Sequence, residues 1–167
     1  EIYNFKLIHI STDCVFKGDK GNYDESYFPD AEDIYGISKS LGECDNKSSL
    51  TIRTSIIGHS DRDKRGLLEW FLSQKKPIRG YNKAFFSGFT TLELAKIIHN
   101  NIIKENNFQS GIFHLSSKKI SKFDLLKKIN KLYKKNIRIV NDKKFVIDRS
   151  LKSTMFKKKI KYKTKNW

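Results

Sequence analysis

Residues 9–43 read HISTDCVFKGDKGNYDESYFPDAEDIYGISKSLGE, and the order of elements in and around this stretch decides the fold. The apolar run FKLIHIS at residues 5–11 predicts a buried strand. After a long polar loop, a helix is predicted from about Asp33, where apolar residues recur at helical spacing: Ile34, Ile37, Leu41 and Cys44. The run SLTIRTSIIG at residues 49–58 predicts a second buried strand. Strand, helix and strand in this order predict the βαβ unit of a parallel sheet.

The rest of the chain continues with further helical and strand patterns. Helices are predicted for RGLLEWFLSQ, TTLELAKIIHNNIIKEN and SKFDLLKKINKLYKK, at residues 65–74, 90–106 and 121–135. Strands are predicted for KPIRGY, GIFHLSS, NIRIV and KFVID, at residues 76–81, 111–117, 136–140 and 144–148. Thr90 and Glu93 form a capping box at the start of the second of these helices, and Trp70 is expected to be a buried residue of the first. No repeat or linker divides the chain of 167 residues, so one globular domain is the default expectation.

The formal net charge of +16 raises the question of nucleic-acid binding, because clustered cations bind phosphates by releasing counterions. Two features argue against it. The chain has 28 Lys but 6 Arg, and Arg is the residue favoured for planar recognition of phosphates and bases. The densest basic run, FKKKIKYKTKNW at residues 156–167, is expected to be a solvated tail.

The cysteine, histidine and apolar patterns argue against a metalloprotein, a disulfide-bonded protein and a membrane protein. Cys14 and Cys44 and the four histidines match no metal or redox spacing, so no metal site is predicted. Two thiols without a disulfide framework fit a reducing cytoplasm. No run of about 18 apolar residues and no secretory signal pattern occurs, so we expect a soluble cytoplasmic protein without a membrane partner.

Thr12, Tyr35 and Lys39 form the candidate catalytic set. Tyr35 and Lys39 are four residues apart and share one helix face, where a cation stabilises the phenolate that a proton-exchanging tyrosine needs. About 1.2 Tyr-x-x-x-Lys matches are expected by chance from 7 Tyr and 28 Lys, and one occurs, so the pair alone proves little. Thr12, however, follows the first strand at the carboxyl edge of the predicted sheet, where α/β proteins place their ligands. Such a set could bind and protonate a ketone oxygen during hydride transfer from a nicotinamide.

The same stretch resembles the catalytic segment of the extended short-chain dehydrogenase/reductases, and most closely their dTDP-4-dehydrorhamnose reductase branch. The matching residues fall in three groups: Ser11, Thr12, Asp13, Val15 and Phe16; Gly21, Tyr23 and Glu25; and Tyr35, Gly36, Ser38, Lys39, Gly42 and Glu43. The likeness continues more loosely through LTIRTSIIG, FFSGFTTLELAKII, GIFHLSS and DRSLKSTMF. Cys14 replaces a Tyr of the family motif, and SGFTT stands where an Arg-Pro-Thr-like sequence is common, which leaves the particular nucleotide-sugar open.

The resemblance implies a role for each matching residue. Tyr35 would donate the proton to the keto oxygen, Lys39 would bind the nicotinamide ribose, and Thr12 would bind the same keto oxygen. The cofactor, NADPH or NADH, would be contacted by a further set: Ser11, Tyr35, Lys39, Thr54, Ser55, Ile56 and Ile57. The nucleotide-sugar substrate would be contacted by Thr12, Val15, Phe16, Ser87 and Arg149.

The resemblance also implies a fold and a division of the chain. The expected fold class is α/β: the C-terminal part of a Rossmann-type parallel sheet plus a small α/β substrate-binding lobe. Residues 1–60 would end the Rossmann-type domain and carry the catalytic segment, and residues 61–167 would form mainly the substrate-binding lobe, intertwined with the first part. The Gly-x-x-Gly-x-x-Gly turn that binds the pyrophosphate is absent from the sequence, so the expected partners include an N-terminal half or a partner chain. A homodimer would also cover an exposed strand edge.

Four functions remain open from the sequence. The first is reduction of a nucleotide-activated 4-keto-deoxysugar by NAD(P)H, in the supply of sugars for polysaccharide. The second is epimerisation or dehydration of another sugar nucleotide by the same residues. The third is a non-catalytic binding or regulatory role, as in relatives resembling the regulatory chain of methionine adenosyltransferase. The fourth is nucleic-acid binding through the lysine surface.

Overall fold

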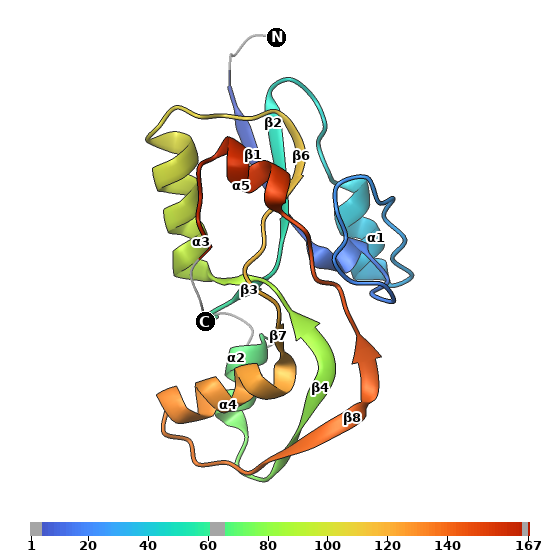
Figure 1. The fold of residues 1–167 in the computed structure, drawn as a ribbon, viewed down its shortest axis with the longest axis vertical. Helices are drawn as coiled ribbons and strands as arrows, with labels where there is room; N and C mark the ends of the chain where they lie inside the picture. Colours follow the sequence, from blue (N-terminus) through green and yellow to red (C-terminus); the bar gives the residue numbers. More distant parts are fainter. Residues whose placement is uncertain (1–4, 61–65, 165–166) are drawn as a thin grey trace.

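The computed structural model describes residues 5–60, 66–164 and 167, which form two packed units (Figure 1). The first unit contains a three-stranded parallel sheet in the order β1–β2–β6, made of Leu7–Thr12, Ser49–Thr54 and Gly111–His114. The second contains a sheet in the order β7–β4–β8, made of Ile120–Ser121, Ile78–Phe86 and Ile139–Ile147. A short parallel pair, β3 (Ile56–Ile57) with β5 (Phe89–Thr90), lies between them. The expected parallel βαβ unit and the α/β class are therefore confirmed.

Five α-helices and two short helical turns lie within the described residues. The helices are α1 (Ile34–Leu41), α2 (Leu67–Ser73), α3 (Thr91–Ile98), α4 (Lys122–Leu132) and α5 (Thr154–Lys159), and the first turn is a 3₁₀ turn, η1 (Asp13–Val15). Asp33, Thr90 and Ser121 cap the N-termini of α1, α3 and α4, each accepting a backbone N–H three residues on. Beyond α3, residues 99–103 (η2) form a π-helical turn, so the expected long helix is α-helical over its first half.

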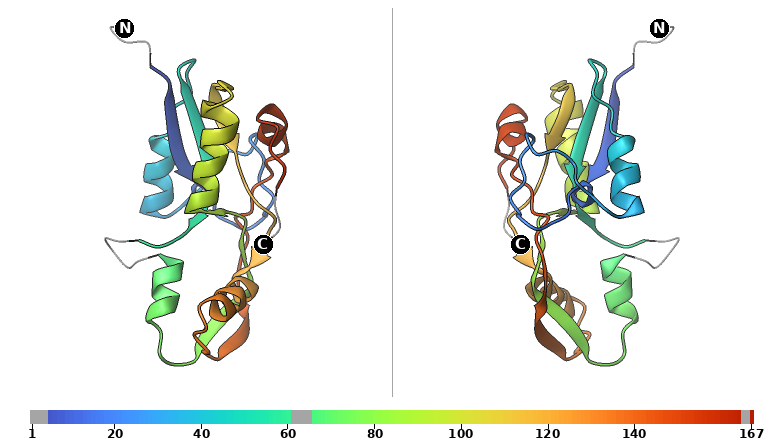
Figure 2. Two further views of the ribbon diagram at one scale, coloured as in Figure 1. Left: turned by 90° about the vertical axis from the view of Figure 1, so that its left-hand side faces the viewer. Right: turned by 90° about the vertical axis from the view of Figure 1, so that its right-hand side faces the viewer.

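The first unit is built around one apolar core on one face of the parallel sheet. Helices α3 and α5 pack there, and the core residues are Leu50, Ile52, Phe89, Leu94, Ile97, Ile102, Phe113, Leu115, Phe156 and Ile160. Figure 2 shows α1 and α5 on opposite sides of this sheet. Because Phe156 and Ile160 are fully buried, the expectation of a solvated tail is wrong for this part of the basic run. Lys158 and Lys159 of this helix are exposed, whereas Lys157 is half-buried.

The second unit has its own core and two features that differ from expectation. Its core residues are Ile57, Leu68, Phe71, Ile78, Phe86, Leu125, Leu126 and Ile129. NIRIV and KFVID, expected as two strands, belong to the single strand β8, which pairs in parallel with β4. Trp70, expected to be buried, is 40% exposed because α2 packs through Leu68 and Phe71 instead.

The apolar stripe predicted on α1 is exposed rather than buried. Ile34 and Leu41 are 87% and 83% exposed, and Ile37 is also exposed. The helix packs through another residue, Gly36, which lies against the backbone of Cys14 and is buried. The periodicity located the helix correctly but not the face that packs within this chain.

A row of polar residues crosses the other face of the parallel sheet. Ser11, Arg53 and His114 are register partners on β1, β2 and β6. Arg53 donates from Nε and Nη2 to the two carboxylate oxygens of Glu43, at 2.8 and 2.7 Å, and both side chains are almost fully buried. Ser11 Oγ donates to the same carboxylate at 2.7 Å. Glu43 follows α1, so this ion pair fixes the end of that helix to the central strand.

His114 connects the polar row to the loop after β1. Its Nδ1 donates to the carbonyl of Tyr23 at 3.0 Å, and its Nε2 lies 3.3 Å from Arg53 Nη1. The Glu25 carboxylate accepts the backbone N–H of His114 and so caps the edge of β6. Burial and the neighbouring Arg53 charge lower the pKa of His114 from 6.5 to about 4, so the imidazole is neutral near pH 7.

We expect Arg53→Met to cost about 3–5 kcal/mol of unfolding free energy, because Glu43 would be left buried without its cation. The control is Arg79→Met, which removes an exposed guanidinium 3.7 Å from Asp142 and should cost less than about 1 kcal/mol. Denaturant unfolding followed by circular dichroism measures both values. Equal losses in the two variants would contradict a structural role for the buried pair.

The lowered pKa of His114 predicts that stability falls on mild acidification. The folded-state pKa of about 4 lies below the unfolded value of 6.5, so the unfolded chain binds more protons between these values. The contribution of His114 to the free energy of unfolding is present above pH 6.5. It should fall by roughly 1.5 kcal/mol between pH 6.5 and 5. Denaturant melts at several pH values, compared with His114→Gln, isolate this contribution. An identical pH slope in the variant would disprove the assignment.

Candidate functional site

The candidate site begins where the strands of the parallel sheet end. Thr12 and Thr54 are register partners at the last positions of β1 and β2. The Thr12 hydroxyl accepts the backbone N–H of Cys14 at 3.1 Å and so starts the η1 turn. The same hydroxyl donates to Asp13 Oδ1 at 3.3 Å. Thr12 is therefore held at the carboxyl edge of the sheet, the ligand-binding edge of open α/β folds.

Helix α1 carries Tyr35 and Lys39 to the same edge. Lys39 Nζ donates to the carbonyl oxygen of Ile10 at 2.8 Å, so the lysine reaches the strand that ends in Thr12. An ammonium has three donors and this bond uses one. Tyr35 lies in the first turn and is 56% exposed, so its phenol is accessible to a ligand.

Gly36 sets the distance between α1 and the turn after Thr12. A Cβ at this position would lie 2.3 Å from the carbonyl oxygen of Cys14 and 2.5 Å from Cβ of Ala31. Only a glycine allows the helix to pack this closely, because both obstacles are parts of the backbone or bonded directly to it. The close packing of Gly36 thus brings the backbone of the preceding residue, Tyr35, near the end of β1.

A cleft of about 200 Å³ lies next to these elements and between the two units. It is lined by Asp13, Cys14, Ser55, Ile56, Ile57, Leu67, Phe85, Phe86, Lys122, Ile147 and Arg149. Four predicted site residues, Ser55, Ile56, Ile57 and Arg149, come together here from distant parts of the chain. Arg149 donates weakly to Asp33 Oδ2, at 3.4 Å, and to the carbonyl of Lys17. Arg149 therefore connects the end of β8 with the start of α1.

Sequence reasoning gave no chemical role to three residues that line this cleft. Burial raises the pKa of the Asp13 carboxyl, although hydrogen bonds from Cys14 and Thr12 oppose the shift. Burial also raises the pKa of the Cys14 thiol, so it stays protonated near pH 7. Lys122 contributes a cation from the start of α4. Asp13 lay within the quoted motif, whereas Lys122 had no signal in the sequence because its position depends on the packing of the second unit.

Other predicted contacts lie away from the cleft surface. Val15 and Phe16 are fully buried with Tyr23 and Leu151, and Phe16 stacks on Tyr23 with ring centroids 4.4 Å apart. The buried Ser87 hydroxyl accepts the backbone N–H of Leu151 at 3.3 Å. A ligand could reach these three side chains only if the surrounding loops moved, so their substrate contacts stay predictions. Ser11 likewise uses its hydroxyl to bind Glu43.

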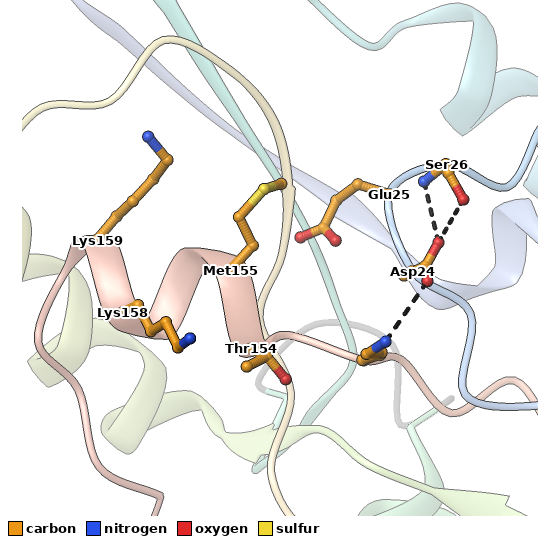
Figure 3. A pocket seen from close by; sticks show the side chains of 8 residues that line it. Asp24, Glu25, Ser26, Thr154, Met155, Lys158 and Lys159 are labelled. Atoms are coloured by element: carbon orange, nitrogen blue, oxygen red, sulfur yellow. Dashed lines mark hydrogen bonds and ion pairs between the residues drawn. The ribbon is translucent and has the colours of Figure 1, made fainter.

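A larger open hollow of about 720 Å³ lies elsewhere, between residues 24–26 and α5 (Figure 3). Asp24 there lies 3.8 Å from Lys152 and accepts hydrogen bonds from Ser26, and Met155, Lys158 and Lys159 line the α5 side. None of the predicted site residues lines this hollow. We therefore place the candidate site at the smaller cleft, because Ser55, Ile56, Ile57 and Arg149 line it. Thr12, Tyr35 and Lys39 are not among its lining residues; Thr12 directly precedes Asp13, which lines the cleft.

The structure describes residues 5–60, 66–164 and 167, and two further kinds of site are absent from these ranges. Within these ranges no group of three His, Cys, Asp or Glu side chains could hold a metal ion. In the same ranges no helix is long and apolar enough to cross a membrane.

The fold and the position of the cleft define a Rossmann-type α/β protein with an appended small α/β lobe. The chain belongs to the family described as RmlD substrate binding domain, whose model matches residues 1–166. No curated protein matches the sequence significantly.

Solved structures agree with this family. A hypothetical dTDP-4-dehydrorhamnose reductase from Sulfolobus tokodaii is 30% identical, with a TM-score of 0.73, over 92% of this chain and 57% of that chain. The dTDP-4-dehydrorhamnose reductase from Bacillus anthracis, in complex with NADP, is 24% identical, with a TM-score of 0.74. The match covers 95% of this chain and 60% of that chain. The dTDP-glucose 4,6-dehydratase from Bacillus anthracis, in complex with NAD, is 17% identical, with a TM-score of 0.68. The match covers 96% of this chain and 57% of that chain. The chain thus spans less than two thirds of each of these proteins.

We expect Gly36→Ala to lower the unfolding free energy by about 1–3 kcal/mol, because the added methyl group collides with the Cys14 carbonyl. Gly42→Ala at the end of the same helix is the matched control, since its nearest atom would be 3.5 Å away and its φ is −85°. Thermal and denaturant unfolding measure both changes. Equal stability of the two variants would show that α1 does not depend on the close approach.

Proposed function

We propose that this chain provides the proton-donating and substrate-binding part of an enzyme that uses NAD(P)H to reduce a nucleotide-activated 4-keto-deoxysugar. The observation that carries the proposal is the placement of Thr12, Tyr35 and Lys39. The strand end and the candidate catalytic helix are joined directly, through the bond from Lys39 to Ile10 and through the contact of Gly36 with Cys14. Family membership and the neighbouring reductases support the same reaction.

The residues present fit the reacting end of a nicotinamide cofactor. Ile56 is half exposed at the cleft and offers an apolar surface, next to the polar Ser55. Lys39 has donors for ribose hydroxyl groups beyond its bond to Ile10. A bound nicotinamide would supply the hydride, and the printed sequence contains no glycine-rich turn for its pyrophosphate. Whether the cofactor is NADH or NADPH stays open in this proposal.

In the proposed reaction the protein positions the ketone and supplies a proton. The Tyr35 hydroxyl binds the keto oxygen and gives it a proton as the negative charge develops. The Thr12 hydroxyl donates to the same oxygen once its O–H has rotated away from Asp13. Lys39, one helical turn away, favours the resulting phenolate electrostatically. Arg149 and Lys122 at the cleft provide positive charge for the phosphates of a nucleotide-sugar. We propose accordingly that residues 1–60 carry the chemistry and residues 61–167 mainly form the substrate lobe.

A dehydratase is the second candidate, and a specific observation favours it. Asp13 lines the cleft next to Thr12 and has a raised pKa because it is buried. A carboxyl group that holds its proton more tightly is suited to donate it to a leaving hydroxyl. Analysis of the products separates dehydration from reduction. In dehydration the cofactor is reduced and reoxidised within one turnover, so no net NAD(P)H is consumed.

We expect Tyr35→Phe to lower kcat for a nucleotide-linked 4-keto sugar by about 10²–10⁴-fold, because the proton donor is removed. The measurement is oxidation of NADPH and NADH by the full-length protein with a panel of such sugars. Tyr27→Phe is the control, since Tyr27 is also a partly exposed tyrosine but lies outside α1 and packs against Tyr23. Nucleotide-sugar binding without oxidation of either cofactor would overturn the reductase proposal and leave a dehydratase, an epimerase or a binding subunit.

A further inference from the structure

A second cavity, of about 460 Å³, lies between α2, α4 and the β3–β5 pair. Its apolar lining consists of Ile57, Leu68, Leu125, Ile129, Leu132 and Trp167. Among the described lining residues, the cleft and this cavity share Ile57 alone. The two therefore meet at the β3 segment but are otherwise lined by different residues, and this cavity is distinct from the candidate catalytic site.

Three polar side chains from different elements meet at this cavity. His59, which follows β3, contacts Glu69 of α2 through Nδ1 at 2.6 Å and the Tyr133 hydroxyl through Nε2 at 2.9 Å. The His59 and Tyr133 rings are also in edge contact, with centroids 5.8 Å apart. The Glu69 carboxylate accepts from Nδ1 and fixes the imidazole ring. Where Nε2 donates to the Tyr133 oxygen, the phenol O–H is left to donate to a ligand in the cavity.

The charge around the cavity is positive. Lys128 of α4 is exposed and lines it, and among the described lining residues none is acidic. Glu69 is engaged by His59 and is mostly buried. The cavity thus combines an apolar wall, one free-standing cation and a hydrogen-bonding pair. A volume of 300–1,000 Å³ with few converging polar groups is typical of small-molecule sites.

We propose that this cavity binds a small aromatic carboxylate. The ring occupies the apolar wall formed by Ile57, Ile129 and Trp167, and the carboxylate lies toward Lys128 and the Tyr133–His59 pair. The ligand is an anion because the lining offers the Lys128 cation and the Tyr133 hydroxyl, and none of the described lining residues carries a carboxylate. The ligand is aromatic or similarly flat because the wall is formed largely by branched aliphatic side chains and an indole. The proposal uses no residue of the catalytic set and does not depend on the proposed reaction.

The test uses 1-naphthoate as the probe and the neutral 1-naphthalenemethanol as the matched ligand, with the full-length protein. Binding is followed by backbone amide chemical shifts in two-dimensional NMR titrations. Three variants are compared: Lys128→Glu, Tyr133→Phe and, as the matched charge control, Lys131→Glu. Lys131 is an exposed residue of the same helix that does not line the cavity, so both Lys→Glu changes alter the net charge equally.

We expect saturable binding of 1-naphthoate with the largest shifts at residues 57–59, 125–133 and 167. Lys128→Glu should raise the Kd of 1-naphthoate by about five-fold, the size of effect expected from loss of one exposed ion pair. The Kd of 1-naphthalenemethanol should not change. Tyr133→Phe should raise the Kd of 1-naphthoate by a smaller factor, and Lys131→Glu should leave it unchanged. The proposal is overturned by an absence of saturation, by equal effects of the two Lys→Glu changes, or by shifts centred on Asp13 and Arg149.

Discussion

The buried ion pair between Glu43 and Arg53 connects the parts of the first unit that carry the candidate chemistry. Arg53 is on the central strand, and Glu43 follows the helix that carries Tyr35 and Lys39. The same carboxylate accepts the hydroxyl of Ser11, the residue before Thr12. A buried carboxylate is costly unless its hydrogen bonds are satisfied, so this geometry tolerates little displacement of α1 relative to β1 and β2.

The network extends from this pair to the loop that crosses the edge of the sheet. His114 is held neutral by burial and by Arg53, and it binds the backbone of Tyr23. Tyr23 in turn stacks on Phe16 in the small third cluster. The loop after β1 is thereby attached to β6 at the far edge of the sheet. Residues that resemble catalytic-motif positions, such as Glu25, Tyr23 and Glu43, have structural roles in this arrangement.

The two cavities differ in the chemistry they offer. The cleft at the strand ends combines a buried carboxyl, two cations and aromatic walls, which suits a polar phosphate-bearing ligand. The second cavity is largely apolar, with one lysine and one hydrogen-bonded pair at its lining. The β3 segment separates them, and Gly88 allows this segment to pack tightly, since a Cβ there would lie 1.9 Å from the carbonyl of Ser55. Ligands at the two sites would therefore both lie close to this one short strand.

The sequence by itself determined the elements and the candidate catalytic set. Apolar runs, caps and helical spacing depend on local propensity, so β1, β2, α1, α4 and the start of α3 were located to within a few residues. The motif from Ser11 to Glu43 indicated the family because many positions match at fixed spacing. Tertiary structure alone decided which face of α1 packs, since Gly36 outweighs the apolar stripe by allowing close backbone contact. It also decided the burial of Phe156 within a lysine-rich segment and the meeting of His59, Glu69 and Tyr133. These contacts join residues far apart in the chain, and no local pattern encodes such distances.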